Sequence, residues 1–228
     1  MKKLILMMLA ALMLLTACSS EPKPEVQTDP LGNKYYLYRD KEGIAEKEKI
    51  ELSDGFYNWA YYDESGTHII KSERFNASDE QIGHTEYEFD ADGNMIKDTS
   101  FLKDGTEGTR MEYAYENGNK TYQATYKSGV ILREEYFDEN EHKIMTKTYE
   151  NGELTEWSEP FTDEETGVNG HFYYRPDNTL RLMQEFGYNE NNEFVTTETE
   201  FDENEEVVKI TASTTTKTGI KEEVLFER

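Results

Sequence analysis

Apolar and polar residues alternate one by one along much of the chain. One segment shows the pattern clearly, with apolar residues alternating with acidic ones: Met111, Tyr113, Tyr115, Glu112 and Glu116. Successive side chains of a β-strand point to opposite faces, so this period of two predicts strands with one apolar and one wet face. No window sustains a helical period, and the only stretch in which a short helix is compatible with the sequence is 41–52.

Turn signals separate the alternating segments at intervals of roughly 10–14 residues. Many contain Asn-Gly, Asp-Gly or Ser-Gly, pairs that adopt the positive φ of tight turns. The signals lie at Arg39–Gly43, Ser53–Gly55, Asp63–Gly66, Asp90–Gly93, Lys103–Gly105, Glu116–Gly118, Lys127–Gly129, Asp138–Asn140, Glu150–Gly152, Pro176–Asn178, Asn189–Asn192 and Asp202–Asn204. One strand and one turn per interval predict an all-β fold, an antiparallel meander of tandem β-hairpins with about 14 strands in an extended or curled sheet.

A longer repeat runs through the same region. An aromatic residue followed by an acidic or polar turn recurs about every 22–27 residues, the length of one β-hairpin. The copies are Tyr62–Gly66, Phe89–Gly93, Tyr115–Gly118, Phe137–Asn140 and Phe201–Asn204, with Tyr174–Asn178 as the intervening copy where the period stretches.

Some of these copies resemble known repeats. Tyr115–Gly118, Tyr126–Gly129 and Tyr149–Gly152 resemble MORN-variant repeats, in which an aromatic residue and a glycine mark each hairpin. Phe89–Asn94 resembles the related YD (Tyr-Asp) repeats of bacterial surface proteins. The resemblance extends over residues 57–201 and implies a tandem array of β-hairpins.

The N-terminal segment departs from the alternating pattern. Two lysines precede an unbroken apolar run over 4–15, which is shorter than the roughly 20 residues of a transmembrane helix and has the length of a signal-peptide core. The run ends in Leu15-Thr16-Ala17-Cys18, which resembles the lipobox of bacterial lipoproteins. The resemblance implies cleavage before Cys18, a diacylglyceryl group on its sulfur and a further acyl chain, such as palmitate, on its new amino group. The alternative is an ordinary secretory signal with a chance cysteine.

These features predict three parts: a lipoprotein signal peptide at 1–17, a flexible tether at 18–33 and a repetitive β-hairpin domain at 34–228. The tether contains three prolines among polar residues and no apolar period. Two or three acyl chains on Cys18 anchor a protein firmly to a membrane. We therefore expect a lipid-anchored protein of the bacterial cell envelope that faces outside the cytoplasm, with no cofactor besides this covalent lipid.

The net charge of the chain limits the classes of partner that we expect it to bind. The net charge is −24, and removal of the signal leaves 22 basic and 48 acidic residues. Phosphate backbones require clustered Lys and Arg, so we expect no nucleic-acid partner. Such acidity favours cationic partners, including divalent ions. The single cysteine, Cys18, leaves no second thiol for a disulfide, and the abundance of Tyr and Phe indicates a folded domain.

The sequence offers little catalytic chemistry. It contains no Gly-x-Ser-x-Gly motif, no glycine-rich phosphate loop and no pair of histidines at zinc-ligand spacing, so we predict no catalytic residues. Asp90, Asp92 and Asn94 are the candidate metal ligands, since alternate oxygens before a glycine are typical of calcium loops. A type I′ turn with a G1 bulge accounts for the same residues without an ion, and we favour the turn.

Aromatic residues remain as the most informative candidates. They crowd residues 35–62, and Trp157 stands alone later. Exposed aromatic stripes on a sheet bind carbohydrate or peptide, but we expect most of these rings to form the core of the sheet. The first hypothesis is a non-catalytic binding or scaffold module for a protein or glycan partner. The alternatives are an enzyme or accessory protein acting on cell-envelope polysaccharide, and an extracellular protein that binds divalent cations.

Overall fold

The computed structural model describes residues 23–216 and 219–228, which contain 17 strands and no helix. Within the described residues there is accordingly no helix of the length and apolarity that crossing a membrane requires. The all-β prediction is confirmed, with more strands than the expected 14 or so. The lipobox and Cys18 lie outside the described residues.

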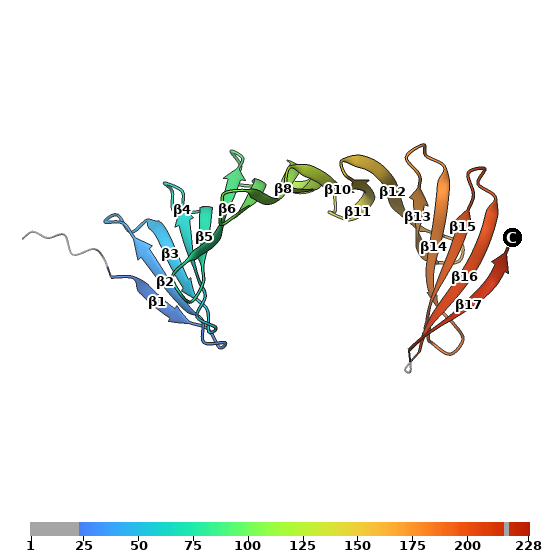
Figure 1. Ribbon diagram of the computed structural model, residues 1–228, viewed down its shortest axis with the longest axis horizontal. Coiled ribbons are helices and arrows are strands. Elements are labelled where there is room, and N and C mark those ends of the chain that lie inside the picture. The colour runs from blue at the N-terminus through green and yellow to red at the C-terminus, as the bar shows by residue number, and fades with distance from the viewer. Residues whose placement is uncertain (1–22, 217–218) are drawn as a thin grey trace, which may run out of the picture. The chain divides into compact units, whose positions relative to one another are not determined.

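The strands follow one another along the chain, as the labels in Figure 1 show. Their bounds are β1 (Glu25–Thr28), β2 (Lys34–Arg39), β3 (Ala45–Glu51), β4 (Tyr57–Tyr62), β5 (Ile69–Phe75), β6 (Gln81–Phe89), β7 (Met95–Leu102), β8 (Glu107–Glu116), β9 (Asn119–Lys127), β10 (Val130–Phe137), β11 (Lys143–Glu150), β12 (Glu153–Thr162), β13 (Asn169–Tyr174), β14 (Leu180–Tyr188), β15 (Phe194–Phe201), β16 (Val207–Thr216) and β17 (Gly219–Glu227). The chain divides into two compact units at His84, within β6. In the first unit β1 to β5 pair antiparallel in chain order, and in the second unit β7 to β17 do the same.

The first strand corrects the predicted tether at 18–33. β1 lies inside that range and pairs with β2, with Val26 opposite Tyr36. Asp29 closes the turn between the two strands, because its carboxylate accepts the backbone N–H groups of Leu31 and Asn33 at 2.9 Å. All four residues of β1 are exposed, so backbone pairing and turn chemistry, rather than an apolar pattern, create this strand.

The stretch 41–52, where a helix was compatible with the sequence, forms β3 instead. Its Ala, Glu and Lys residues favour helices on intrinsic propensity. Pairing with the neighbouring strands makes it a strand instead, since Lys47 pairs with both Tyr38 on β2 and Tyr61 on β4. The ammonium groups of Lys47 and Lys49 lie over aromatic rings on the adjacent strands, where the electron density of the rings stabilises them.

The turn at Asp90–Asn94 is not the predicted type I′ turn. Only Gly93 of this turn has a positive φ, at 86°, and its N–H bonds to the carbonyl of Asp90 at 3.2 Å. This geometry is a type I turn followed by a G1 bulge. Type I′ turns, which need two consecutive positive φ values, occur at Asn117–Gly118, Ser128–Gly129 and Asn151–Gly152.

The repeat stretches between Phe137 and Phe201 because its turns move from even-numbered strands to odd-numbered strands. The turns after Tyr115 and Phe137 each lead from an even-numbered strand to an odd-numbered one. The turns after Tyr174 and Phe201 lead from an odd-numbered strand to an even-numbered one. Since neighbouring strands run in opposite directions, the two sets of turns lie at opposite ends of the strands of the second unit.

Neither unit contains a core of the kind that two packed layers form. Among the described residues, the buried hydrophobic residues are three alanines, Ala45, Ala60 and Ala124, and no large side chain is fully buried. Among the described strands of each unit, backbone contacts join each strand to its neighbours in the chain. The aromatic rings therefore do not form the buried core that the sequence suggested. They are half-covered by the side chains beside them on the same face.

Candidate functional site on the sheet faces

In the first unit, lysines lie over three of the aromatic residues that crowd 35–62. Lys47 Nζ lies 5.3 Å from the ring centroids of both Tyr38 and Trp59, and Lys49 Nζ lies 4.4 Å from the ring of Tyr57. A lysine placed over an aromatic face is stabilised by the ring's electron density. These rings therefore form an internal ladder, and their faces are already occupied by the protein's own lysines.

In the second unit, a network of hydrogen bonds centred on a carboxylate joins β9, β10 and β11. Glu134 accepts hydrogen bonds from the hydroxyls of Tyr122, at 2.8 Å, and Tyr149, at 2.5 Å. Lys147 Nζ lies 3.8 Å from the same carboxylate, whose side chain is 16% exposed. Burial alone raises the pKa of Glu134, but the two hydroxyl donors and Lys147 outweigh it and lower the pKa below its ordinary value. Glu134 is thus an ionised structural acceptor.

Trp157 does not stand alone, because it stacks on Tyr174 of the neighbouring strand with 4.0 Å between ring centroids. On the same face, Phe161 stacks on Phe172 at 4.3 Å and lies over Gly170, directly opposite it in the register. A Cβ at Gly170 would collide with the Phe161 ring and with a backbone oxygen of β14. An aromatic ring that covers a strand glycine in this way supports the sheet where a side chain is missing.

The β14–β15 hairpin carries the most exposed aromatic cluster. Tyr188 and Phe194 pair directly across the two strands, with 5.6 Å between ring centroids. Phe186 stacks near Phe194 at 6.2 Å, and His171 lies 5.8 Å from Phe186. Tyr188 is 70% exposed and Phe194 is 38% exposed, so water reaches both rings. Partial burial lowers the pKa of His171, which favours its neutral form.

We call Phe186, Tyr188 and Phe194 the aromatic patch. Sequence reasoning missed it, because alternation places these rings on one face without saying whether that face is covered. The signal that was available is local density, since three aromatic residues lie within nine positions around an Asn-rich turn.

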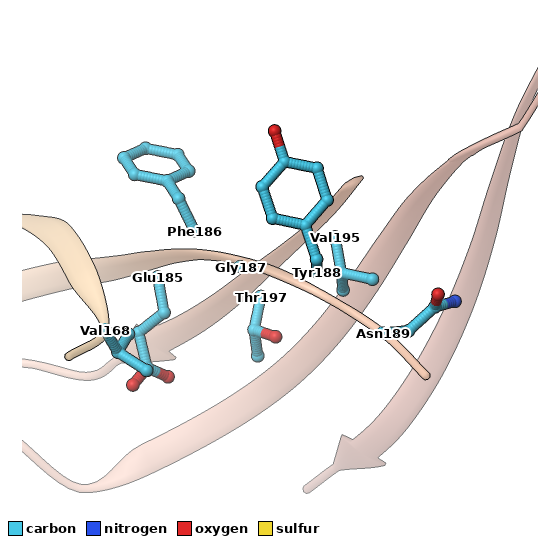
Figure 2. A pocket seen from close by; sticks show the side chains of 8 residues that line it. All are labelled: Val168, Glu185, Phe186, Gly187, Tyr188, Asn189, Val195 and Thr197. Atoms are coloured by element: carbon cyan, nitrogen blue, oxygen red, sulfur yellow. The ribbon is translucent and has the colours of Figure 1, made fainter. Parts of the chain in front are cut away.

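The opposite face of the same hairpin is hollowed. Figure 2 shows the Glu185 side chain pointing away from the side on which the rings of Phe186 and Tyr188 stand. A shallow hollow of about 300 Å³ lies along this hairpin. The residues with side chains that line it are Val168, Glu185, Phe186, Tyr188, Asn189, Val195 and Thr197. Gly187, which contributes no side chain, lies at its centre opposite Val195.

Asp90, Asp92 and Asn94, the candidate metal ligands, make hydrogen bonds within the turn. One oxygen of Asp90 accepts the backbone N–H groups of Asp92 and Asn94 at 3.0 and 2.9 Å, and the other accepts the Asn94 amide at 2.9 Å. The bond from the Asn94 side chain is the chief reason why the pKa of Asp90 lies below its ordinary value. In the part of the chain that the structure describes, no group of three or more His, Cys, Asp or Glu is placed to hold a metal ion.

The fold and these surfaces define an antiparallel meander of tandem β-hairpins. No protein-family model matches the chain, and no curated protein matches it. Solved structures that are similar to it include that of TcdB2-TccC3-TEV, at 11% identity, and that of TcdB2-TccC3 without its hypervariable C-terminal region, at 10% identity, each with a TM-score of 0.21. The matches cover 86% and 89% of this chain but only 14% and 17% of the respective neighbours. A likeness at this level carries no argument about function.

Proposed function

We propose that the protein is a non-catalytic binding module, anchored by lipid on Cys18 to the outer side of a bacterial membrane, that holds a protein or glycan partner. The observation that carries the proposal is the aromatic patch. Tyr188 and Phe194 are exposed, whereas Tyr38, Trp59 and Tyr57 of the first unit lie beneath the protein's own lysines. Rigid aromatic side chains supply large contact areas at low entropic cost, and they dominate the binding energy of many interfaces.

The flanking residues support a binding surface. Asn191 and Asn192 at the tip of the hairpin and Thr215 on β16 line the same depression as Tyr188 and Phe194. Amide and hydroxyl groups beside an exposed ring provide the polar contacts that orient a ligand stacked on that ring. The partner therefore meets apolar area and hydrogen-bonding groups together.

The aromatic patch is tested by binding to glycan and peptide arrays. The chain from residue 19 onward, which keeps every strand that the structure describes, is compared with a Tyr188→Ala/Phe194→Ala variant. Loss of two exposed anchors should weaken binding about 30-fold, the effect of removing an interface hot spot. Leu102→Ala, which truncates another exposed apolar residue on a different strand, is the matched control. Equal binding by the double variant and the control would contradict the proposal, as would silence on both arrays.

The anchor needs a separate test. Cells expressing the full chain are fed an alkyne-tagged fatty acid, and label on the protein is measured together with its partition into detergent. We expect Cys18→Ala to abolish the label, because the sulfur that receives the lipid is gone. Persistent labelling of this variant would refute lipidation at Cys18 without affecting the binding role of the patch.

A further inference from the structure

We infer that the hollow beside Glu185 is a binding site for an alkylammonium group, the side chain of a lysine in a basic peptide. Glu185 points away from the face on which the rings of the aromatic patch stand, and the site goes beyond the function proposed for that patch. It is built by the register of β14 and β15, in which Glu185 lies opposite Thr197 and Gly187 opposite Val195.

The hollow exists because a side chain is missing. A Cβ placed on Gly187 would meet no atom within 4 Å, so the space above this residue is open. Gly187 is not among the glycines with a positive φ, so its backbone does not demand glycine. Val168, just before β13, and Val195, on β15, provide apolar walls beside this space.

Glu185 brings the only charge to this lining. Within residues 23–216 and 219–228, its carboxylate takes part in no hydrogen bond or ion pair, and the lining includes no Lys, Arg or His. Nearby carboxylates are engaged differently: Glu198 accepts a hydrogen bond from Gln184, and Glu159 accepts one from Tyr174. The hollow therefore presents one unneutralised negative charge among apolar and hydroxyl groups.

This chemistry selects a cation with an aliphatic stem. The charge of Glu185 attracts an ammonium and repels phosphate or carboxylate groups. The valine walls suit methylene groups, which lysine buries along apolar surfaces while its charged end seeks a carboxylate. The volume is at the lower limit of small-molecule sites, which fits one side chain rather than a chain of sugars. A net charge of −24 draws basic peptides toward the protein as a whole.

The test is a titration, followed by NMR, of the chain from residue 19 onward with the peptide acetyl-Gly-Gly-Lys-Gly-Gly-amide. The same peptide with norleucine in place of lysine keeps the stem and removes the charge. We expect shifts at Gly187 and Thr197 with the lysine peptide and at least fivefold weaker binding of the norleucine peptide. Glu185→Gln should weaken lysine binding about fivefold, the effect of one partly exposed ion pair, and Gly187→Val should abolish it by filling the hollow.

The matched control is Glu200→Gln. It removes the same charge from the adjacent strand, but Glu200 is exposed on the opposite face, across from Leu182. If Glu185→Gln and Glu200→Gln weaken binding equally, general electrostatic attraction explains it and the site is refuted. Equal binding of the norleucine peptide also refutes it. Phe194→Ala truncates a ring of the aromatic patch that does not line the hollow. This variant should bind the lysine peptide normally, so failure of the hollow and failure of the aromatic patch are distinguishable. Circular dichroism verifies that each variant is folded.

Discussion

Glycine does two different things in this protein, and its backbone angles separate them. Gly118 ends a type I′ turn with φ of 86°, whereas Gly187 lies in a strand without a positive φ. An added Cβ meets no atom within 4 Å at either position. The difference between them is therefore one of backbone conformation alone.

Gly118→Ala should lower the free energy of unfolding by about 1 kcal/mol, because an L-residue with a Cβ is strained in the left-handed region. Gly187→Ala should lower it by much less, or raise it slightly, since alanine fits an extended strand. Urea unfolding followed by circular dichroism measures both. Equal effects of the two substitutions would show that backbone strain does not control the turn.

At the residue scale, the sequence predicted the positions of turns better than it predicted which faces of the sheet are covered. Asn-Gly and Asp-Gly identify hairpins because few residues tolerate positive φ. Five turns instead use non-glycine residues there, which are Asp79, Glu141, Asn178, Asn192 and Glu205. Two of them make contacts that pattern reasoning does not foresee: Glu141 accepts the backbone N–H of Lys120, and Glu205 accepts that of Leu180. Both contacts join turns more than 20 residues apart.

At the scale of elements, cross-strand pairs replace a core. Alternation predicted most strands, because half-exposed strands have a period of two whether or not a second layer covers them. For the same reason it did not reveal that the aromatic faces are uncovered. Alternation also missed β1, which is short and exposed and has a single apolar residue. The turn that Asp29 closes brings β1 beside β2.

The Glu134 network should contribute measurably to the three strands that it joins. Glu134→Ala leaves the hydroxyls of Tyr122 and Tyr149 without their acceptor, so we expect about 2 kcal/mol of destabilisation. Tyr122→Phe and Tyr149→Phe should each cost less than this. A double-mutant cycle between Glu134→Ala and Tyr149→Phe, measured by urea unfolding, should show coupling. Strict additivity would argue that the hydrogen bond contributes nothing to stability.

Tyrosines on β4 and β13 make the protein's stability sensitive to alkali. Burial first, and then a hydrogen bond to Glu73, raise the pKa of Tyr61 to about 12; burial and Glu159 do the same for Tyr174. An unfolded tyrosine ionises near pH 10. Because the folded pKa values are raised, this stabilisation is complete below pH 10 and is lost as the pH rises from about 10 to 12. Tyrosinate absorbance should rise together with loss of the strand signal in circular dichroism. Ionisation of all tyrosines near pH 10 in a folded protein would contradict this.

At the scale of the whole molecule, the order of contacts decides how stability is distributed. Within each unit, the backbone contacts of the described strands join neighbours in the chain, as in repeat proteins whose stability is a sum of local terms. Such a protein opens segment by segment rather than all at once. A lesion in one hairpin should therefore be felt chiefly by the strands next to it.

Gly170→Ala provides the test, because its Cβ would collide with the Gln184 backbone oxygen and the Phe161 ring. Relief of this overlap should cost about 3 kcal/mol, at the upper end of overpacking penalties, and should open the hairpins around β13. Amide hydrogen exchange should accelerate in β12 to β14 and stay unchanged in β2 to β4 of the first unit. Gly187→Ala on β14, where a Cβ has open space, should leave both regions protected. Uniform loss of protection across all strands would instead mean that the two units unfold as a single cooperative body, with coupling that neighbouring-strand contacts do not supply.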